Sequence, residues 1–383
     1  MQVPMIKAIK EAGYNSLVTD ANPQAPGAAI ADQFVQVSTY DVSAHQDLAE
    51  SMTEKPIAVL TVGADVGPTV SAVAEILGVP AAPYDVADRT RNKLEMRRAL
   101  YDISPVLTLE IDASGFSPHG QWKALCRSAS KEPYPCVLKP LELSGSRGVI
   151  KINSPWEWES ALRAARLAGN TKKRKLMVEE ILTPVEEVAL DFLVQNGKVH
   201  FVNGALRLFR GFGIEVGHIN PYVPSQKMID MARAAAEKLG VTFGPFKVDF
   251  IVDKYRGPLI VECATRLSGG FDHMTSAPLA TGRDITGAML DLALGKPLDM
   301  RKIKVKHPGY VAVLAITHLE PGTVKEWKLP EVDEVSFEII NNEIKTLRDC
   351  ADRSAFAVAY GRTPMGALVR ATKAAKQVEV VYA

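Results

Sequence analysis

Helical and extended segments alternate over the first 88 residues, and this alternation restricts the fold of that region more than any other feature. Residues 4–12 and 66–77 have the apolar spacing of helices, and each segment is followed by a glycine that would end it. Three short apolar segments suit strands, namely residues 16–20, 33–38 and 57–62. Helices that alternate with strands predict a doubly wound parallel sheet, which is an α/β arrangement.

One element of such a sheet is missing from the sequence. A doubly wound sheet normally begins with a strand near its centre, whereas this chain begins with a helix. Without that strand, backbone groups would be left unpaired and the core would contain a gap. We therefore expect that residues upstream of Met1 are absent and that this unit lacks its first strand. A smaller sheet is the alternative.

The composition excludes several classes of protein. A chain of 383 residues predicts two or three packed units. The net charge of +1 argues against nucleic acid or an acidic membrane surface as a partner. The sequence has no apolar run long enough to span a bilayer, and its N-terminus lacks the apolar segment of a signal peptide. The four scattered cysteines lack zinc-site spacing and indicate reduced thiols in a cytoplasmic protein.

The remainder of the chain is expected to be of the α+β type. Further helices are expected over residues 43–52, where Ser43 would be the cap, and over 85–100, 155–168, 226–239, 284–294 and 365–377. Strands are expected over residues 135–140, 149–152, 176–182, 188–194, 198–203, 246–252 and 259–263, and the chain is strand-rich after residue 309.

A lysine near the end of a predicted strand precedes a glycine-rich loop. Lys139 is followed by the loop Ser144-Gly-Ser-Arg-Gly148, and a second strand returns directly after it. Such a loop presents backbone N–H groups to an anion, and the lysine adds a positive charge, so the pattern suits phosphate binding. It is neither a Walker loop nor a dinucleotide fingerprint, because the loop joins strand to strand. An ordinary hairpin beside a surface lysine is the alternative.

Two acidic residues lie in neighbouring apolar strands. Asp249 stands in Val-Asp-Phe and Glu262 in Ile-Val-Glu. A carboxylate in an apolar strand is costly unless it faces a cation, and two converging carboxylates are how Mg²⁺ is usually held in proteins. A pair of acids on exposed strand faces is the alternative.

Arg266 follows Glu262 by four residues and precedes a Gly-Gly pair, Gly269 and Gly270. An arginine at this place can clamp a phosphoryl or carboxylate group, and the glycines allow the backbone to approach a substrate. A structural ion pair between Arg266 and Glu262 or Asp249 is the alternative.

In order and spacing, these segments resemble the ATP-grasp superfamily, and within it the carboxylate–amine ligase branch, related to the ATP-grasp domains of carbamoyl-phosphate synthase and biotin carboxylase. The resemblance covers the whole chain and is most specific over residues 137–270. It implies an enzyme that uses ATP to phosphorylate a carboxylate and then transfers the acyl group from the acyl phosphate to an amine. ADP and phosphate would be released.

The resemblance also implies a division of the chain. It predicts a Rossmann-like pre-ATP-grasp domain over residues 1–88, an ATP-grasp domain over 89–300 with a lid subdomain at about 130–182, and a small strand-rich C-terminal region with a final helix over 301–383. The substrates would be small-molecule carboxylates and amines, and amino acids in particular. A homodimer through the N-terminal unit is a further implication.

Roles for single residues follow from their places in the motifs. The resemblance assigns Lys93 and Lys139 to the phosphates of ATP, and Lys139 and Arg266 to catalysis. The loop over the β- and γ-phosphates would be Ser144, Gly145, Ser146, Arg147 and Gly148. The adenine would contact Glu179 and the backbones of Glu180 and Leu182, and the ribose would contact Glu187, or Glu186 if the register slips by one. Asp249 and Glu262 would hold Mg²⁺, or Mn²⁺ in its place.

The acid and amine substrates are expected near a further group of residues. These candidates are Arg210, His218, Arg266, Gly269, Gly270 and His273, and Arg207 is another arginine suited to a substrate carboxylate. For the histidines and for Arg207 and Arg210, a position in an exposed loop is the alternative.

The sequence departs from the family pattern at two positions. Ala264 stands where the family usually has an asparagine that ligates metal, and Asp249 stands where glutamate is more common. Both departures put a second Mg²⁺ site in doubt. Two other functions therefore stay open, namely a carboxylase-type enzyme that activates bicarbonate and a regulatory protein that binds ATP without turnover.

Overall fold

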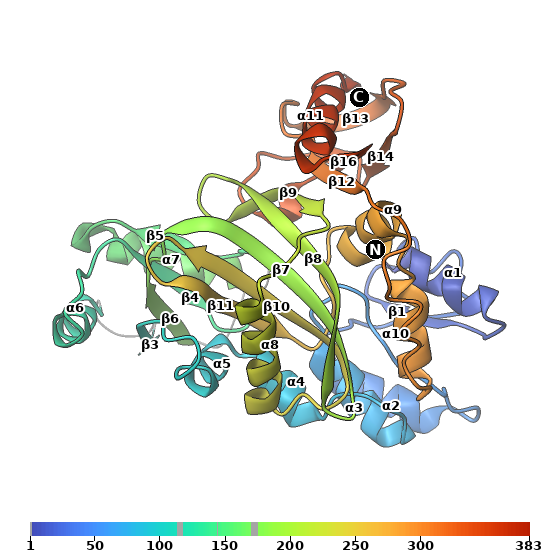
Figure 1. The fold of residues 1–383 in the computed structure, drawn as a ribbon, viewed down its shortest axis with the longest axis horizontal. Coiled ribbons are helices and arrows are strands. Elements are labelled where there is room, and N and C mark those ends of the chain that lie inside the picture. Colours follow the sequence, from blue (N-terminus) through green and yellow to red (C-terminus); the bar gives the residue numbers. More distant parts are fainter. Residues whose placement is uncertain (1, 113–117, 144, 170–174) are drawn as a thin grey trace.

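The computed structural model describes residues 2–112, 118–143, 145–169 and 175–383 (Figure 1). The N-terminal unit contains α1 (Val3–Glu11), β1 (Leu17–Asp20), β2 (Gln33–Gln36), α2 (Val42–Ser51) and α3 (Gly67–Leu77). Strands β1 and β2 pair in parallel, and α3 ends at Gly78 in the left-handed conformation. These elements lie where the sequence predicts them. The cap of α2, however, is Asp41 and not Ser43, since the carboxylate of Asp41 accepts from the N–H of Ala44.

The predicted strand at residues 57–62 is wrong. This segment joins no ladder in the described part of the chain, where β1 pairs with β2 alone. The N–H and carbonyl of Val62 bond instead to the side-chain amide of Gln2, at 3.2 and 2.9 Å. An apolar sequence becomes a strand only where another strand lies beside it to pair with its backbone.

The predicted helix at 85–100 is two helices, α4 (Tyr84–Arg91) and α5 (Lys93–Ala99). Asn92 separates them in an extended conformation, and its side-chain oxygen accepts from the N–H groups of Leu94 and Glu95. Asparagine is a favoured N-cap because its side chain satisfies these free donors. The break places Lys93 at the first position of α5.

A four-stranded antiparallel sheet with two covering helices forms the teal-to-green lobe that carries the labels α6 and α7 in Figure 1. Its strand order is β3-β6-β4-β5, and its strands are β3 (Thr108–Asp112), β4 (Cys136–Pro140), β5 (Ile150–Ile152) and β6 (Lys175–Glu180). Its core is built around the buried rings of Trp122 and Trp158, from α6 (His119–Ser128) and α7 (Trp158–Gly169), which follows the short helix Pro155–Glu157. Residues 108–112 thus extend this sheet beyond the predicted lid.

The second large sheet has eight strands in the order β11-β10-β7-β8-β9-β12-β16-β14. Its first five strands are β11 (Gly257–Ala264), β10 (Gly244–Asp253), β7 (Pro184–Gln195), β8 (Lys198–Arg210) and β9 (Ile214–Asn220). The other three are β12 (Tyr310–Ala315), β16 (Ala355–Gly361) and β14 (Val335–Ile339). The sheet therefore continues into the region after residue 300, and β9 is a strand that the sequence patterns did not indicate.

Helices and short strands complete the fold. They are α8 (Gln226–Leu239), the π-helix η2 (Asp272–Ser276), α9 (Ala277–Thr281), α10 (Ile285–Ala293), the short helix η3 (Cys350–Asp352) and α11 (Pro364–Lys376), with a small sheet of β13 (Gly322–Lys328), β15 (Glu343–Ile344) and β17 (Glu379–Tyr382). Among the described residues, no helix combines the length and apolar character that a membrane crossing needs.

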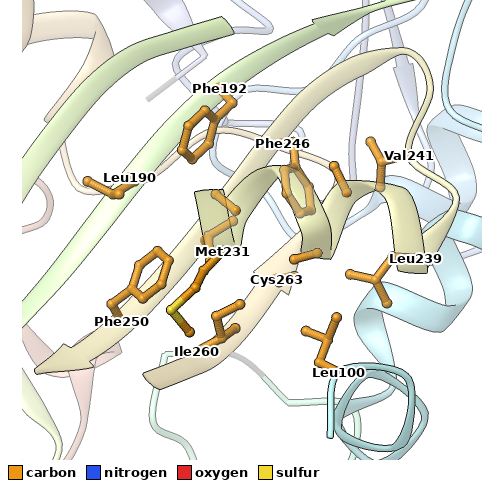
Figure 2. Close-up of a cluster of buried hydrophobic side chains, with 14 of the residues drawn as sticks. Leu100, Leu190, Phe192, Met231, Leu239, Val241, Phe246, Phe250, Ile260 and Cys263 are labelled. Atoms are coloured by element: carbon orange, nitrogen blue, oxygen red, sulfur yellow. The ribbon is translucent and has the colours of Figure 1, made fainter. Parts of the chain in front are cut away.

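Helix α8 covers one face of the eight-stranded sheet. Figure 2 shows Phe192, Phe246 and Phe250 from the strands in the same buried cluster as Met231 and Leu239 from α8. Successive side chains of a strand point to opposite faces. The residues next to these phenylalanines therefore point to the other face of the sheet, and that face carries the polar side chains described below.

Candidate active site

Five neighbouring strands place polar side chains on the face opposite α8. Asp191 alternates with the buried Leu190 and Phe192 in β7, and Asn203 lies directly opposite it in β8. The group on this face comprises Glu187, Asp191, Asn203, Arg207, His218, Lys247, Asp249 and Glu262. We call this set the polar face. Charged groups that share one face of a buried sheet need compensating partners.

Asp249 and Glu262 lie directly opposite each other in the antiparallel pair β10–β11. Lys93 Nζ lies 3.2 Å from Glu262 Oε1, and Lys247 Nζ lies 2.5 Å from Asp249 Oδ2. Burial alone would raise the pKa of Glu262, but the charges of Lys93, Lys247 and Arg266 lower it to about 2. The two carboxylates that the sequence singled out therefore converge, and Glu262 stays ionised.

Lys247 and Arg207 are functional candidates that the motifs did not include among the expected metal and phosphate residues. Arg207 Nη1 donates to Glu215 Oε2 at 2.5 Å, and its Nη2 lies 3.9 Å from Asp249 Oδ1. Burial would lower the pKa of Arg207, but Glu215, Asp249 and Asp272 raise it. The alternation Lys-Val-Asp at residues 247–249 was the available signal, because it places Lys247 on the same face as Asp249.

Lys139 belongs to a buried ion-pair network between the two sheets. Its Nζ lies 2.5 Å from Glu179 Oε2, and Arg97 Nε donates to Glu179 Oε1 at 2.6 Å. Burial opposes ionisation of Glu179, but the charges of Arg97 and Lys139 lower its pKa to about 2. Arg97 also donates to the carbonyls of Ile260 and Val261 in β11, at 2.6 and 3.4 Å. Both oxygens of Glu179 are thus engaged by cations, and its side chain orients Lys139.

The other residues expected near adenine and ribose lie at the junction of β6 and β7. Glu180 accepts from the Leu107 N–H at 2.8 Å and pairs with Lys131 and Arg256, while its own N–H donates to the Leu107 carbonyl. Leu182 follows the end of β6 by two residues.

Glu187 lies on the polar face, whereas the carboxylate of Glu186 accepts from the Tyr222 hydroxyl at 2.7 Å. The register therefore favours Glu187 of the two alternatives. Burial and the nearby Asp249 raise the pKa of Glu187 to about 7.

The glycine-rich loop is described from residue 145 onward, and Ser144 lies outside the described residues. Gly145, Ser146 and Gly148 have positive φ values of 67°, 60° and 70°. A Cβ atom on Gly148 would lie 2.9 Å from the Pro140 ring, so a side chain there would collide with the end of β4. The loop, including Arg147, turns tightly back onto the strand that carries Lys139.

The segment after Glu262 is fixed by contacts to strand β7 and to the loop that contains Gly63 and Asp65. Arg266 Nε lies 3.4 Å from Asp65 Oδ1, so Arg266 pairs with an aspartate in a loop of the N-terminal unit. The alternative of a structural ion pair with Glu262 or Asp249 is therefore wrong among the described residues. The Ser268 N–H and hydroxyl both donate to Asp191 Oδ1, at 2.8 and 2.9 Å. Gly269 packs directly against Gly63, and a Cβ atom added to Gly63 would lie 2.9 Å from the Cα atom of Gly269. The next residue, Gly270, has a positive φ.

The two histidines are buried, so the exposed-loop alternative is wrong for both. His273 Nδ1 lies 2.6 Å from the Ser268 carbonyl, and burial lowers the pKa of His273 to about 4. His218 Nε2 lies 2.9 Å from the Ser276 hydroxyl. Arg207 lies within β8 with its side chain 11% exposed, so the exposed-loop alternative is wrong for it too. Arg210 lies at the exposed end of β8 and donates to the Thr317 carbonyl at 3.4 Å.

Comparisons with known proteins identify the type of domain. Residues 132–273 match the family model described as ATP-grasp domain. Among curated proteins, a formate-dependent phosphoribosylglycinamide formyltransferase of Bacillus subtilis is 24% identical over 336 residues, which cover 83% of this chain and 77% of that protein. Biotin carboxylase 2 of the same organism is 24% identical over 66% of this chain and 59% of its own length, so the match spans less than two thirds of that relative.

Solved structures resemble the chain over almost its whole length. An L-amino acid ligase from Bacillus licheniformis has a TM-score of 0.78 at 18% identity, with 99% of this chain and 95% of that chain covered. A phosphoribosylglycinamide synthetase from Anaerococcus prevotii has a TM-score of 0.75 at 16% identity, with 100% and 97% covered. Residues 132–273 therefore match an ATP-grasp domain, and the chain has the fold of these solved structures over almost its whole length, as the resemblance in sequence implied.

Proposed function

We propose that the protein is an ATP-dependent ligase that converts a carboxylate to an acyl phosphate and transfers the acyl group to an amine. The observation that carries this proposal is the facing pair of Asp249 and Glu262, which lies between Lys93 and Lys247. Two carboxylates beside two lysines suit a metal ion together with phosphate groups.

The residues present fit a divalent cation. Asp249 Oδ1 is buried and accepts no hydrogen bond within the described part of the chain. A buried carboxylate oxygen without a donor is costly, and a cation bound there would remove that cost. Asp249 and Glu262 would hold Mg²⁺, or Mn²⁺, which neutralises charge on phosphate oxygens when bound. In the solved neighbours, a biotin carboxylase domain from Hydrogenobacter thermophilus holds MgADP, ADP and bicarbonate.

The chain's own groups would act mainly by placement and charge. Lys93 and Lys139 would bind the phosphates of ATP, and the backbone of residues 145–148 would close over them. A substrate carboxylate oxygen would attack the γ-phosphorus while the bond to ADP breaks. Arg266, fixed beside Asp65, would offset negative charge on the transferred group. A neutral amine would then attack the acyl carbon, the bond from that carbon to the phosphate oxygen would break, and the amine nitrogen would lose one proton to the departing phosphate or to water.

The test is ADP and phosphate release from Mg²⁺-ATP in the presence of amino acids, singly and in pairs, with formate and bicarbonate as separate arms. Release that requires one acid and one amine would support the ligase. Release with bicarbonate as the sole acid would favour the carboxylase alternative, which the match to biotin carboxylase 2 also supports. Tight nucleotide binding without release in any arm would favour a regulator.

Site variants test the assignment of residues. We expect Glu262→Ala to abolish ADP release, because the metal loses one of its two carboxylates, and Lys139→Ala to reduce release by about 100-fold or more. Arg98→Ala is a matched control, since Arg98 lies in α5 with Lys93 but pairs on the surface with Glu95 and Glu110. Normal release by either site variant, with the fold intact by circular dichroism, would contradict the assignment.

A further inference from the structure

A buried lysine stands beside the proposed metal ligands. Lys247 is 6% exposed, in the middle of β10, and its Nζ lies 2.5 Å from Asp249 Oδ2. A buried ammonium group is costly unless it is paired, so this side chain is fixed by the carboxylate that it contacts. Its charge also acts on Glu262, whose pKa it helps to lower. Lys247 thus places an ammonium group against Asp249, next to the pair of acids.

The lysines occupy one oxygen of each carboxylate. Lys247 contacts Asp249 Oδ2, and Lys93 contacts Glu262 Oε1. Asp249 Oδ1 has no hydrogen-bond donor among the described residues, although Arg207 lies 3.9 Å away. On each acid, one oxygen is therefore not contacted by a lysine, and these two oxygens would be available to one divalent ion. Phosphate oxygens and water would complete the octahedron that Mg²⁺ requires.

The position opposite Lys247 offers no ligand to a second ion. Ala264 lies directly opposite Lys247 in the β10–β11 register, and its methyl group cannot bind a metal. Over residues 2–112, 118–143, 145–169 and 175–383, no cluster of three or more histidine, cysteine, aspartate and glutamate side chains could hold a metal ion. A second divalent cation at this place would also be repelled by the ammonium group of Lys247.

We propose that the ammonium group of Lys247 takes the place of a second divalent cation, so that the site binds one divalent ion per nucleoside triphosphate. This inference rests on the proposed function, because it assumes that a nucleoside triphosphate binds at the polar face. Lys247 supplies its charge from the chain itself and contacts Asp249, which lies directly opposite Glu262.

Counting bound Mn²⁺ tests the proposal without turnover. The wild-type protein is saturated with Mn²⁺ and the β,γ-imido analogue of ATP, and bound ions per bound nucleotide are measured by equilibrium dialysis and by electron paramagnetic resonance. We expect one ion in the wild type. Lys247→Met keeps the length of the side chain, removes its charge and frees Asp249 Oδ2, so it should bind two ions. Two Mn²⁺ ions about 3.5–4 Å apart would give a spin-coupled spectrum.

Lys302→Met is the matched control. Lys302 Nζ also lies 2.5 Å from an aspartate oxygen, Asp291 Oδ2, but this ion pair joins α10 to the loop that follows it, outside the polar face. This variant should bind one ion. Lys247→Arg, which keeps the charge, should also bind one ion. Lys247→Gln, which likewise removes the charge, replaces Lys247→Met if that variant does not fold, and it should bind two ions.

Each outcome separates the two proposals. Two ions in the wild type would overturn the role of Lys247 and leave the proposed ligase intact. A single ion in a folded Lys247→Met protein would also overturn it, because the ammonium group would not be what excludes the second ion. No binding of the Mn²⁺–nucleotide complex by the wild type would instead overturn the proposed function.

Discussion

At the scale of residues, Asp249 and Glu262 could be predicted because each carboxylate interrupts a short apolar strand. The signals for Lys247 and Arg207 were weaker, since the alternation Lys-Val-Asp indicates only the face on which Lys247 lies, and nothing local indicates that Arg207 pairs with Glu215 of the next strand. The partner of Glu179 illustrates the limit. Arg97 lies 82 residues earlier in the chain, and only the packing of α5 against both sheets brings the two groups within 2.6 Å.

Asp191 provides a prediction on pH. Burial and the neighbouring Asp272 raise its pKa from 3.8 to about 7, although the Ser268 donors oppose this rise. Between these values the folded protein holds this proton and the unfolded chain does not, so the contribution of Asp191 to stability falls as the pH rises through that window. Asp191→Asn removes this titration. The unfolding free energy of the variant, measured by urea at several pH values, should rise relative to wild type from pH 3.8 to about 7.

The same substitution at Asp299 is the control for that experiment. Hydrogen bonds from Arg301 lower the pKa of Asp299 to about 2, so Asp299 titrates below the window in which Asp191 changes. The unfolding free energy of Asp299→Asn should therefore change with pH in parallel with that of wild type between pH 3.8 and about 7. If the unfolding free energy of Asp191→Asn also changed in parallel with that of wild type, the buried carboxyl group of Asp191 would not hold a proton in the folded state.

At the scale of elements, the sequence predicted most helices and strands, and the errors have local or long-range causes. The break at Asn92 carried a local signal, because asparagine is a common N-cap. No local signal indicated that residues 57–62 would not form a strand, since strand formation depends on a pairing strand from elsewhere in the chain. The extension of β8 to Arg210 and the formation of β9 have the same dependence.

The N-cap of α5 leads to a prediction at this scale. Asn92→Ala leaves the N–H groups of Leu94 and Glu95 without their acceptor, and we expect a loss of about 1 kcal/mol of unfolding free energy by urea denaturation. Because Lys93 begins this helix, the variant should also bind the ATP analogue less tightly. Asn92→Asp keeps the acceptor and should restore both quantities. Equal loss in the two variants would show that capping is not the cause.

At the scale of the whole molecule, the eight-stranded sheet could not have been drawn from the sequence. Strands β12, β14 and β16 follow the predicted boundary at residue 300, yet they continue the sheet that carries the polar face. Local patterns identify single strands, but strand order depends on contacts between distant segments. The predicted division into three units therefore stays a prediction, while the ATP-grasp fold itself is confirmed.

Arg97 joins the two large sheets and provides a prediction for the molecule as a whole. It donates to Glu179 in β6 and to the carbonyls of Ile260 and Val261 in β11. Arg97→Ala would leave the buried carboxylate with one partner fewer, and we expect a loss of about 3–5 kcal/mol of unfolding free energy by urea denaturation. The adjacent Arg98→Ala breaks only surface ion pairs and should cost under about 1 kcal/mol. Similar losses in the two variants would contradict this role of Arg97.

The alternation of side chains in β7 and β10 has a consequence for how this protein tolerates change. Odd-numbered positions such as Asp191, Lys247 and Asp249 face the site, and even-numbered neighbours such as Phe192, Val248 and Phe250 fill the core. A saturation mutagenesis map of these strands should therefore show two interleaved phenotypes, lost chemistry at one position and lost solubility at the next. Selection for new substrates can act on one set while the other preserves the scaffold, so the same sheet accommodates divergent chemistry without redesign of its interior.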